Sequence, residues 1–223
     1  MSESLTWDRY ATAWASRHGG YDPRHASTAV RAWLWMSYGL GRIMVRRQVT
    51  PMTLMVTGVV LNVLAVPMAW LAGPLPTAVL VIAGAVAVGV DGAVAVLTSR
   101  TAKLGYLYDA LVARVAELCW LATFWAVGAP VALLVFCGGV AWLHEYVRAK
   151  GVAIGLTAVG SISVGEHSAR LTVTVAGLVL AGLTSYVLGG MAAGTVTIAG
   201  VVWLFLGVFG LVQLLGGIRK SFG

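Results

Sequence analysis

The sequence predicts an all-α membrane protein in which a cytosolic, interfacial amphipathic helix precedes six transmembrane helices. Of its 223 residues, 59% are hydrophobic and only 10% are charged, and the mean hydropathy is +0.88. Soluble domains carry about 25% charged residues, so a membrane protein is expected. Six apolar stretches approach the ~20 residues that cross ~30 Å of hydrocarbon as a helix. They are 52–72, 77–98, 107–127, 131–147, 171–189 and 194–216.

Short uncharged links join these stretches in pairs. They are GPLP at 73–76, GAPV at 128–131 and LGGMAA at 188–193. Helical hairpins joined by such turns form a compact bundle. We therefore expect a cytosolic N-terminal segment over 1–50 and one six-helix transmembrane domain over 51–223.

The basic residues are distributed on one side of this arrangement. Of the 15 Lys and Arg, all except Arg114 fall on the side that holds both termini. The positive-inside rule places that side in the cytoplasm, which predicts a multi-pass protein of the cytoplasmic membrane. The net charge of +7 should attract anionic lipid headgroups or phosphate-bearing substrates. Nucleic acid is the competing interpretation of an isoelectric point near 9.9, and it is not an expected partner.

The N-terminal segment contains an amphipathic pattern over 27–47. Aromatic and aliphatic residues such as Trp33 and Ile43 alternate at helical spacing with Arg31 and Arg46. A helix of this kind lies in the membrane interface. Packing on the cytosolic ends of the bundle is a compatible alternative.

Asp91 lies inside the second apolar stretch and Asp109 inside the third. A charge at mid-bilayer costs ~2.5–3.5 kcal/mol on insertion scales, so such acids indicate a functional site. Because the two helices are antiparallel neighbours, both acids should lie at one depth near the cytosolic surface. Gly92 and Gly105 flank them and would allow close approach of a ligand.

A basic rim lies directly above these carboxylates, because Arg100 and Lys103 join the two helices. Carboxylates below such a rim suit a hard cation that holds a diphosphate. Asp91 and Asp109 balance the charge of only one divalent ion. We therefore expect one Mg²⁺ or Mn²⁺, with these two residues as its ligands.

The stretch around the two acids resembles the signature of the CDP-alcohol phosphatidyltransferase family, D-x2-D-G-x2-A-R-x8-G-x3-D-x3-D. Five positions agree in identity and spacing, namely Asp91, Gly92, Ala95, Gly105 and Asp109. Three positions depart from the signature. Val88 replaces the first aspartate, Val96 replaces the arginine and Ala113 replaces the last aspartate.

The resemblance continues outside the motif. The segment T50-P51-M-T53 is similar to the family's T-P-N with a following threonine, and E145-Y146-V-R148-A149-K150 is similar to its Y-x-R-A-R. The segment E166-H-S-A-R170 resembles a Glu and Arg that open the fifth span in the phosphatidylinositol-phosphate and phosphatidylglycerol-phosphate synthase branches.

The resemblance implies transfer of a phosphatidyl group or phosphoalcohol from a CDP-linked lipid to a hydroxyl acceptor, with release of CMP. It also implies a homodimer formed through membrane spans. It places the nucleotide and diphosphate at Gly92, Ala95, Arg100 and Gly105. It places the acceptor phosphate or anionic headgroup at Arg148, Lys150 and Arg170.

The lost aspartates put this chemistry in question. Val88 and Ala113 cannot bind metal, and in the family the last aspartate is the expected base. A general base contributes about 10²–10⁴-fold. Glu117 lies one turn beyond Ala113 on the same helical face and is a candidate catalytic replacement. An ion pair with Arg114 at i, i+3 is the alternative.

Three functions therefore remain open. The first is an enzyme with a reduced, one-metal site, and the second is a pseudoenzyme that binds lipid or nucleotide. The third is an enzyme acting on another diphosphate, such as a prenyl diphosphate.

The predicted orientation can be tested with single cysteines in the links 73–76 and 128–131, in a background without Cys119 and Cys137. Both links should react with a membrane-impermeant thiol reagent from the outer side only. A cysteine at Lys103 should react from the cytoplasmic side. Labelling of either link from the cytoplasm would contradict the topology.

Overall fold

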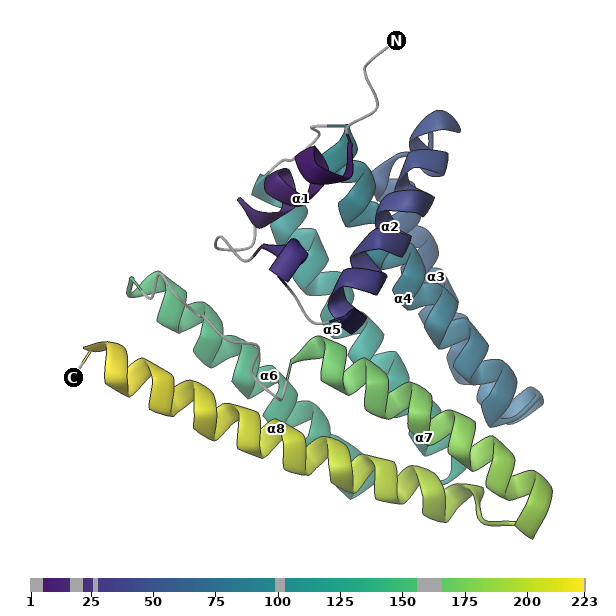
Figure 1. Ribbon diagram of the computed structural model, residues 1–223. Coiled ribbons are helices and arrows are strands. Elements are labelled where there is room, and N and C mark those ends of the chain that lie inside the picture. The colour runs from purple at the N-terminus through teal and green to yellow at the C-terminus, as the bar shows by residue number, and fades with distance from the viewer. Residues whose placement is uncertain (1–5, 17–21, 26–27, 99–102, 156–165, 223) are drawn as a thin grey trace. The chain divides into compact units, whose positions relative to one another are not determined.

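The structure, a computed structural model, describes residues 6–16, 22–25, 28–98, 103–155 and 166–222. Every regular element in these ranges is helical (Figure 1). The elements are α1 (Trp7–Ala15), η1 (Pro23–His25), α2 (Thr28–Arg46), α3 (Pro51–Leu71), α4 (Pro74–Leu97), α5 (Lys103–Val127), α6 (Val131–Ala153), α7 (His167–Leu188) and α8 (Ala192–Phe222). Helices α3 to α8 include six segments long and apolar enough to cross a membrane, which confirms the predicted fold class.

Several helices are longer than the apolar stretches that predicted them. Helix α4 begins at Pro74 because proline is tolerated in the first turn, where its missing N–H is not needed. Helix α6 continues to Ala153, and a hydrogen-bonded pair between Glu145 and Arg148 supports its polar end. Helix α8 has 31 residues and continues through Gly216 and Gly217 to Phe222.

The chain divides into two compact units. The first unit comprises Met1–Val60 and Ala83–Val112, and the second comprises Leu61–Ile82 and Ala113–Gly223.

In the first unit, α1 and α2 pack on the C-terminal half of α4. The ring of Tyr10 lies 5.2 Å from that of Tyr38, and both contact an apolar cluster that includes Ala93 and Val96. A Cβ at Gly41 of α2 would lie 3.0 Å from the Cβ of Ala93, so these helices approach closely. Outside this contact, α2 exposes Trp35, Met36 and Ile43. Such a surface is compatible with the expected position in the membrane interface.

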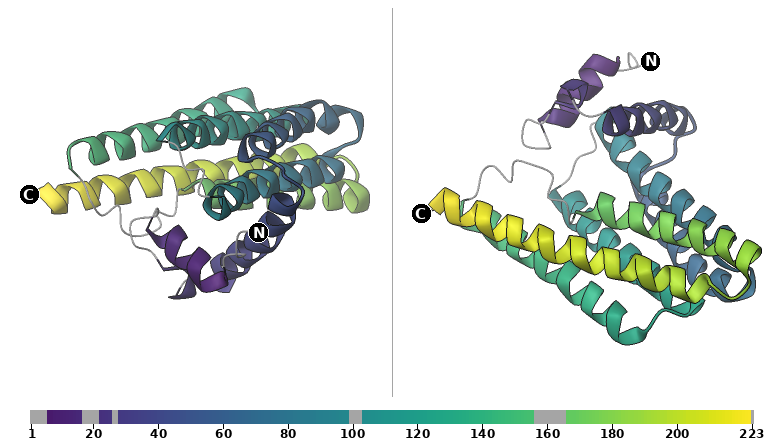
Figure 2. Two further views of the ribbon diagram at one scale, coloured as in Figure 1. Left: turned by 90° about the horizontal axis from the view of Figure 1, so that it is seen from above. Right: turned by 60° about the horizontal axis from the view of Figure 1, so that its bottom comes forward.

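In the second unit, α8 packs against both α6 and α7, and the further views agree (Figures 1 and 2). The core includes the fully buried rings of Trp120, Phe124 and Trp203. Helices approach closely at Gly177, where a Cβ would lie 2.6 Å from the Cβ of Ala199.

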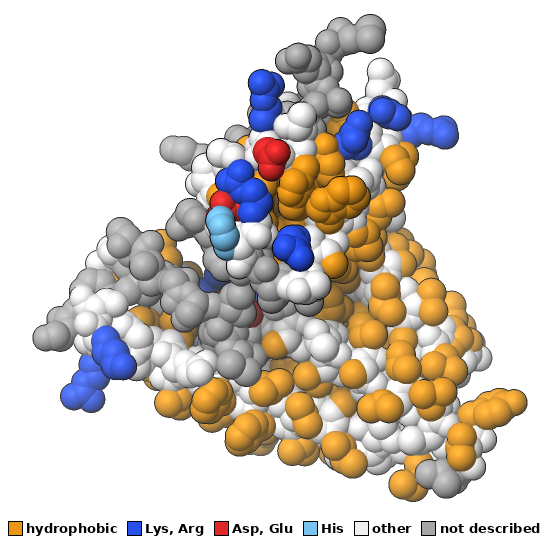
Figure 3. Space-filling view, in the orientation of Figure 1, with side chains coloured by type: hydrophobic (Ala, Val, Ile, Leu, Met, Phe, Trp, Pro, Cys, Tyr) orange, Lys and Arg blue, Asp and Glu red, His pale blue; other side chains and the backbone are white. Residues whose placement is uncertain are grey.

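The outer surface of α7 and α8 is covered by hydrophobic side chains (Figure 3). Charged residues of α8 are confined to its last turn, at Arg219 and Lys220. A helix with apolar side chains exposed along its length is stable next to lipid rather than water. The packing and the surface therefore agree with a membrane-embedded bundle.

Helix packing in the first unit predicts a specific stability effect at Gly58. A Cβ there would lie 2.6 Å from Cγ2 of Val88 and 3.0 Å from the carbonyl oxygen of Gly84. Gly58→Ala should therefore lower stability by about 1–3 kcal/mol through overpacking. At Gly39 of α2 a Cβ would meet nothing within 4 Å, so Gly39→Ala is the matched control. Thermal unfolding in detergent measures both, and equal midpoints for the two variants would contradict this packing.

Candidate functional site

Asp91 of α4 is a buried carboxylate without a hydrogen-bond partner on one of its oxygens. The residue is 4% exposed, and no residue in the described part of the chain bonds to its Oδ2. Buried polar atoms are nearly always hydrogen-bonded, and an exception indicates a ligand, an ion or a catalytic role. Asp91 is therefore the strongest candidate for a functional side chain in the first unit.

Asp109 lies near Asp91. It belongs to the first turns of α5 and is exposed, and the negative charges of the two residues are close enough to repel each other. Like charges brought together beside a membrane are unfavourable unless a cation or a donor neutralises them. The pair therefore suits a positively charged or metal-bound ligand.

The motif glycines border open space. A Cβ added to Gly92 of α4 or to Gly105 of α5 would meet nothing within 4 Å. A glycine inside a helix costs about 1 kcal/mol relative to alanine, so packing within the protein does not account for either residue. Their absent side chains leave room for close approach of a ligand. Ala95, the remaining motif residue in α4, is half-buried.

The substituted motif positions have become part of the packing. Val88 lies against Gly58, and Val96 is 5% exposed inside the cluster with Tyr10 and Tyr38. An arginine at 96 would have to enter an aromatic cluster. Ala113 is half-buried and offers no ligand atom. The replacements are therefore matched to their surroundings.

Asp91 and Asp109 are the two carboxylates that could contribute ligands to a hard cation. The part of the chain that the structure describes contains no group of three or more His, Cys, Asp or Glu side chains placed to hold a metal ion. Asp91 and Asp109 supply carboxylate oxygens, of which Oδ2 of Asp91 is unpartnered. Mg²⁺ is commonly held by one or two carboxylates and completed by substrate phosphates and water.

A second polar cluster, in the second unit, is centred on Glu117 of α5. We call Arg114, Glu117, His167 and Arg170 the charged cluster. Glu117 is 1% exposed. Its Oε1 accepts hydrogen bonds from Nη2 of Arg114 at 2.9 Å and from Nη1 of Arg170 at 3.0 Å, and lies 2.9 Å from Nδ1 of His167. The expected ion pair between Arg114 and Glu117 is present, and α7 adds two further partners.

Arg170 has one edge of its guanidinium unused. The residue is 3% exposed, and its Nε and Nη2 are buried without a partner among the described residues. These two N–H groups form the parallel pair that binds two anionic oxygens. Arg170 is therefore the best placed of the three residues expected to hold an acceptor.

The other predicted binding residues are engaged differently. Arg148 donates to Oε2 of Glu145 at 2.6 Å, and Nζ of Lys150 lies 5.6 Å from the ring of Tyr146. Both are exposed. Arg100 lies outside the residues that the structure describes.

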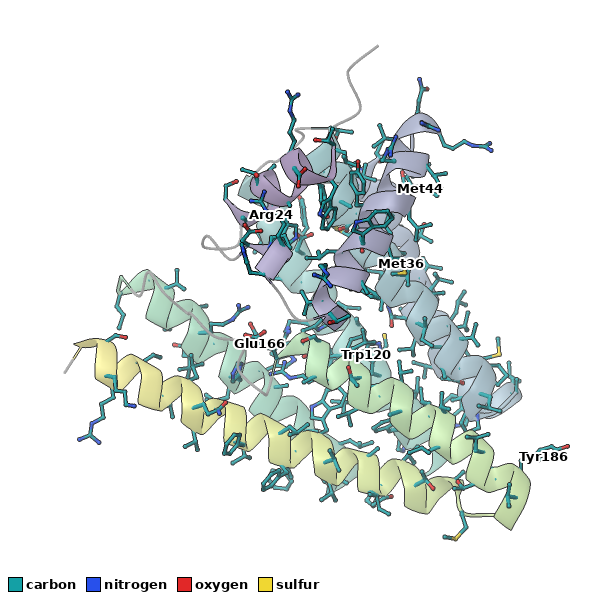
Figure 4. The ribbon with its side chains drawn as sticks, viewed as in Figure 1. Arg24, Met36, Met44, Trp120, Glu166 and Tyr186 are labelled. Atoms are coloured by element: carbon teal, nitrogen blue, oxygen red, sulfur yellow. The ribbon has the colours of Figure 1, made fainter. Side chains whose placement is uncertain are left out.

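His167 was not singled out by the motif, although an acid within a span predicts a cationic or hydrogen-bonding partner. Its ring, in the first residue of α7, lies 4.9 Å from that of Trp120, which is labelled in Figure 4. Nε1 of Trp120 donates to Oδ1 of Asn62 at 2.6 Å. Asn62 therefore links α3 to α5 through a buried hydrogen bond.

The fold is shared with a solved membrane-protein structure. Among solved structures, the chain is similar to the Mycobacterium tuberculosis phosphatidylinositol phosphate synthase (PgsA1) with CDP-DAG bound. The TM-score is 0.63 at 18% sequence identity, over 82% of this chain and 92% of that one. Comparison by sequence with protein-family models gives no match, and comparison with curated proteins gives no significant match. The structural likeness confirms the fold that the motif implied.

The two buried acids should respond oppositely to loss of charge. Asp91→Asn should raise stability by on the order of 1 kcal/mol, because it removes a buried, unpartnered charge. Glu117→Gln should lower stability by about 3 kcal/mol, because Arg114 and Arg170 lose their counter-charge. Thermal unfolding in detergent with a chelator present measures both. A destabilised Asp91→Asn protein would contradict the assignment of Asp91 to ligand binding.

Proposed function

We propose that the protein is a CDP-alcohol phosphatidyltransferase-like membrane enzyme. It transfers a phosphatidyl group or phosphoalcohol from a CDP-linked lipid to a hydroxyl acceptor and releases CMP. The observation that carries the proposal is the buried, unpartnered carboxylate of Asp91 beside the open space at Gly92. The fold shared with a CDP-DAG-bound synthase supports the choice of donor.

At the donor end, Asp91 and Asp109 would hold one Mg²⁺ or Mn²⁺. Such an ion supplies neutralisation of the diphosphate charge. Gly92 and Gly105 leave space for the nucleotide and diphosphate at the helix surfaces. Asp91 and Asp109 supply only two carboxylates, whereas the family motif supplies four. The phosphates of the substrate would therefore complete the coordination of the ion.

At the acceptor end, Arg170 would bind an anionic group on the acceptor. Its Nε and Nη2 already point together, and the guanidinium is held through Nη1 by Glu117. A preformed bidentate donor suits a phosphate or carboxylate. Arg148 and Lys150 are exposed and would add positive charge to the approach.

Binding without turnover is the second candidate. This candidate is favoured because Val88 and Val96 are packed against apolar neighbours. The two substituted motif positions now contribute to helix packing, in addition to having lost their polar groups. A pseudoenzyme would keep the lipid or nucleotide site and lose the transfer. A prenyl or other diphosphate is the alternative donor. The homodimer implied by the family resemblance stays a prediction.

Release of CMP from CDP-diacylglycerol by purified protein tests the proposal, with Mg²⁺, with Mn²⁺ and with a chelator. Glycerol 3-phosphate and glycerol serve as a charged and a neutral probe acceptor. Wild type should release CMP only with a divalent ion, and Asp91→Asn and Asp109→Asn should each lose at least about 100-fold. The exposed Asp8→Asn in α1 is the control and should retain activity.

Three other results of this experiment would each bear on a different part of the proposal. Protein that binds CDP-diacylglycerol and releases no CMP would favour the pseudoenzyme. Protein that neither binds nor cleaves it would overturn the proposed donor. CMP release that persists in the chelator would contradict the metal site.

A further inference from the structure

An apolar groove follows the surface of the second unit between α5 and α6. Its volume is about 660 Å³, and every residue that lines it is apolar. On α5 the lining extends from Leu118 to Trp125, and on α6 it extends from Val131 to Trp142. All of these residues belong to one unit. Because the sequence from 118 to 142 has no charged residue, the groove offers a ligand only apolar contacts.

The groove is hollowed at a pair of glycines in α6. A Cβ at Gly139 would meet nothing within 4 Å, and one at Gly138 would touch Cδ1 of Leu121 at 3.4 Å. Glycine is a poor helix former, so helix packing does not account for Gly139. The indoles of Trp125 and Trp142 also line the groove, and both are exposed. The groove therefore presents a concave apolar surface with room for another molecule.

One side of α6 changes its chemistry along the helix. Val135, Gly139 and Trp142 line the groove, and Tyr146 and Lys150 follow on the same side at helical spacing. Tyr146 and Lys150 are exposed, and Nζ of Lys150 lies 5.6 Å from the centre of the tyrosine ring. This side thus passes from apolar residues through an aromatic ring to a cation. Membrane proteins meet hydrocarbon, interface and anionic headgroups in this order.

The cation at this end of the groove is available to an anion. The carboxylate of Glu145 is already shared between Arg148, whose Nη2 lies 2.6 Å from Oε2, and Arg114, whose Nη2 lies 4.0 Å from Oε1. Among the described residues, no carboxylate pairs with Lys150. The opposite end of the groove adjoins the uncharged link 128–131. A ligand with one anionic end and one apolar end complements this distribution of charge.

The length of the groove matches one leaflet of a bilayer. Lys150 leans back toward Tyr146, since side chains on a helix point toward its N-terminus. From Tyr146 to Val135 the helix rises about 16 Å at 1.5 Å per residue. Half of the ~30 Å hydrocarbon core is about 15 Å. An acyl chain whose headgroup meets Lys150 therefore extends into the groove as far as Val135.

A second copy of the chain fits this groove less well than a lipid does. Copies inserted in the same orientation are related by a two-fold axis along the membrane normal, so identical residues would face each other at one depth. One hollow would then face the other and leave a cavity between them. The two copies of Lys150 would also repel each other. A flexible acyl chain fills a concave surface and introduces no second cation.

We propose that the groove between α5 and α6 binds an anionic phospholipid. One acyl chain lies in the groove over Gly139, in contact with the indoles of Trp125 and Trp142, and the phosphate meets the ammonium of Lys150. The site does not rest on the proposed transfer function, because it needs neither a donor nor an acceptor. Lys150, which adds only general charge to the approach of an acceptor, makes a direct contact here.

Native mass spectrometry of the full chain in mild detergent tests the charge preference. The protein is mixed with equal amounts of phosphatidylglycerol and phosphatidylcholine that have the same acyl chains. Wild type should retain phosphatidylglycerol at least about fivefold better, because one lysine near a membrane surface contributes about that factor. Lys150→Gln should lose this factor. Lys220→Gln, which removes an exposed lysine from the last turn of α8, is the matched control and should keep it.

Photolabelling tests the position of the acyl chain. Phosphatidylglycerol with a diazirine in its acyl chain, diluted into phosphatidylcholine nanodiscs, should label wild type mainly on peptides within 118–142. Gly139→Leu should lower this labelling several-fold, because the new side chain enters open space in the groove. Gly216→Leu, at a glycine of α8 that also borders open space, is the matched control and should be labelled as wild type. Thermal unfolding verifies that both variants fold.

Four results would overturn the lipid site. They are equal retention of the two lipids by wild type, an unchanged preference in Lys150→Gln, labelling spread evenly over all six spans, and unchanged labelling of a folded Gly139→Leu protein. Lys150 is exposed, so its variant keeps the proposal testable if Gly139→Leu does not fold. A Val135→Cys protein without Cys119 and Cys137 tests the second copy. A disulfide between copies, together with loss of lipid labelling, would assign the groove to a second copy and overturn the proposal.

Discussion

The second unit depends on how a buried carboxylate in an apolar helix is neutralised. Glu117 is 1% exposed, and Arg114, His167 and Arg170 surround it. Removing one partner of a buried ion pair costs about 3–5 kcal/mol, because the other charge remains uncompensated. Since two of the partners lie in the first turn of α7, the same interaction joins α7 to α5. Nε and Nη2 of Arg170 and Nε2 of His167 take no part in this interaction.

Asp91 presents the opposite case in the first unit. It is also buried in a membrane-spanning helix, but one of its oxygens has no partner among the residues described. The two glycines beside Asp91 and Asp109 face open space, whereas Gly58 and Gly41 fit against neighbouring helices. A charge without a partner and glycines without a packing role both lower stability. Their occurrence together favours a ligand site, since functional sites retain such costs.

The sequence predicted the fold because each span carries its own signal in length and apolarity. The ends of the helices were less predictable. Pro74, Arg148 and Gly216 each suggest a helix boundary in the sequence, yet each belongs to a helix in the structure. The Arg114–Glu117 pair was predictable from its spacing. The contacts of Glu117 with His167 and Arg170 span 50 and 53 residues of sequence, and only the folded chain brings them together. The apolar packing of Val96 likewise depends on α1 and α2.

We propose above that Asp91 and Asp109 form a diphosphate site with a single cation. Anomalous scattering from Mn²⁺, in crystals grown with CDP-diacylglycerol, tests it most directly. One peak is expected, in contact with both carboxylates and with the diphosphate of the lipid. Two fully occupied Mn²⁺ sites in the absence of ligand, or a peak remote from both carboxylates when the lipid is bound, would contradict it.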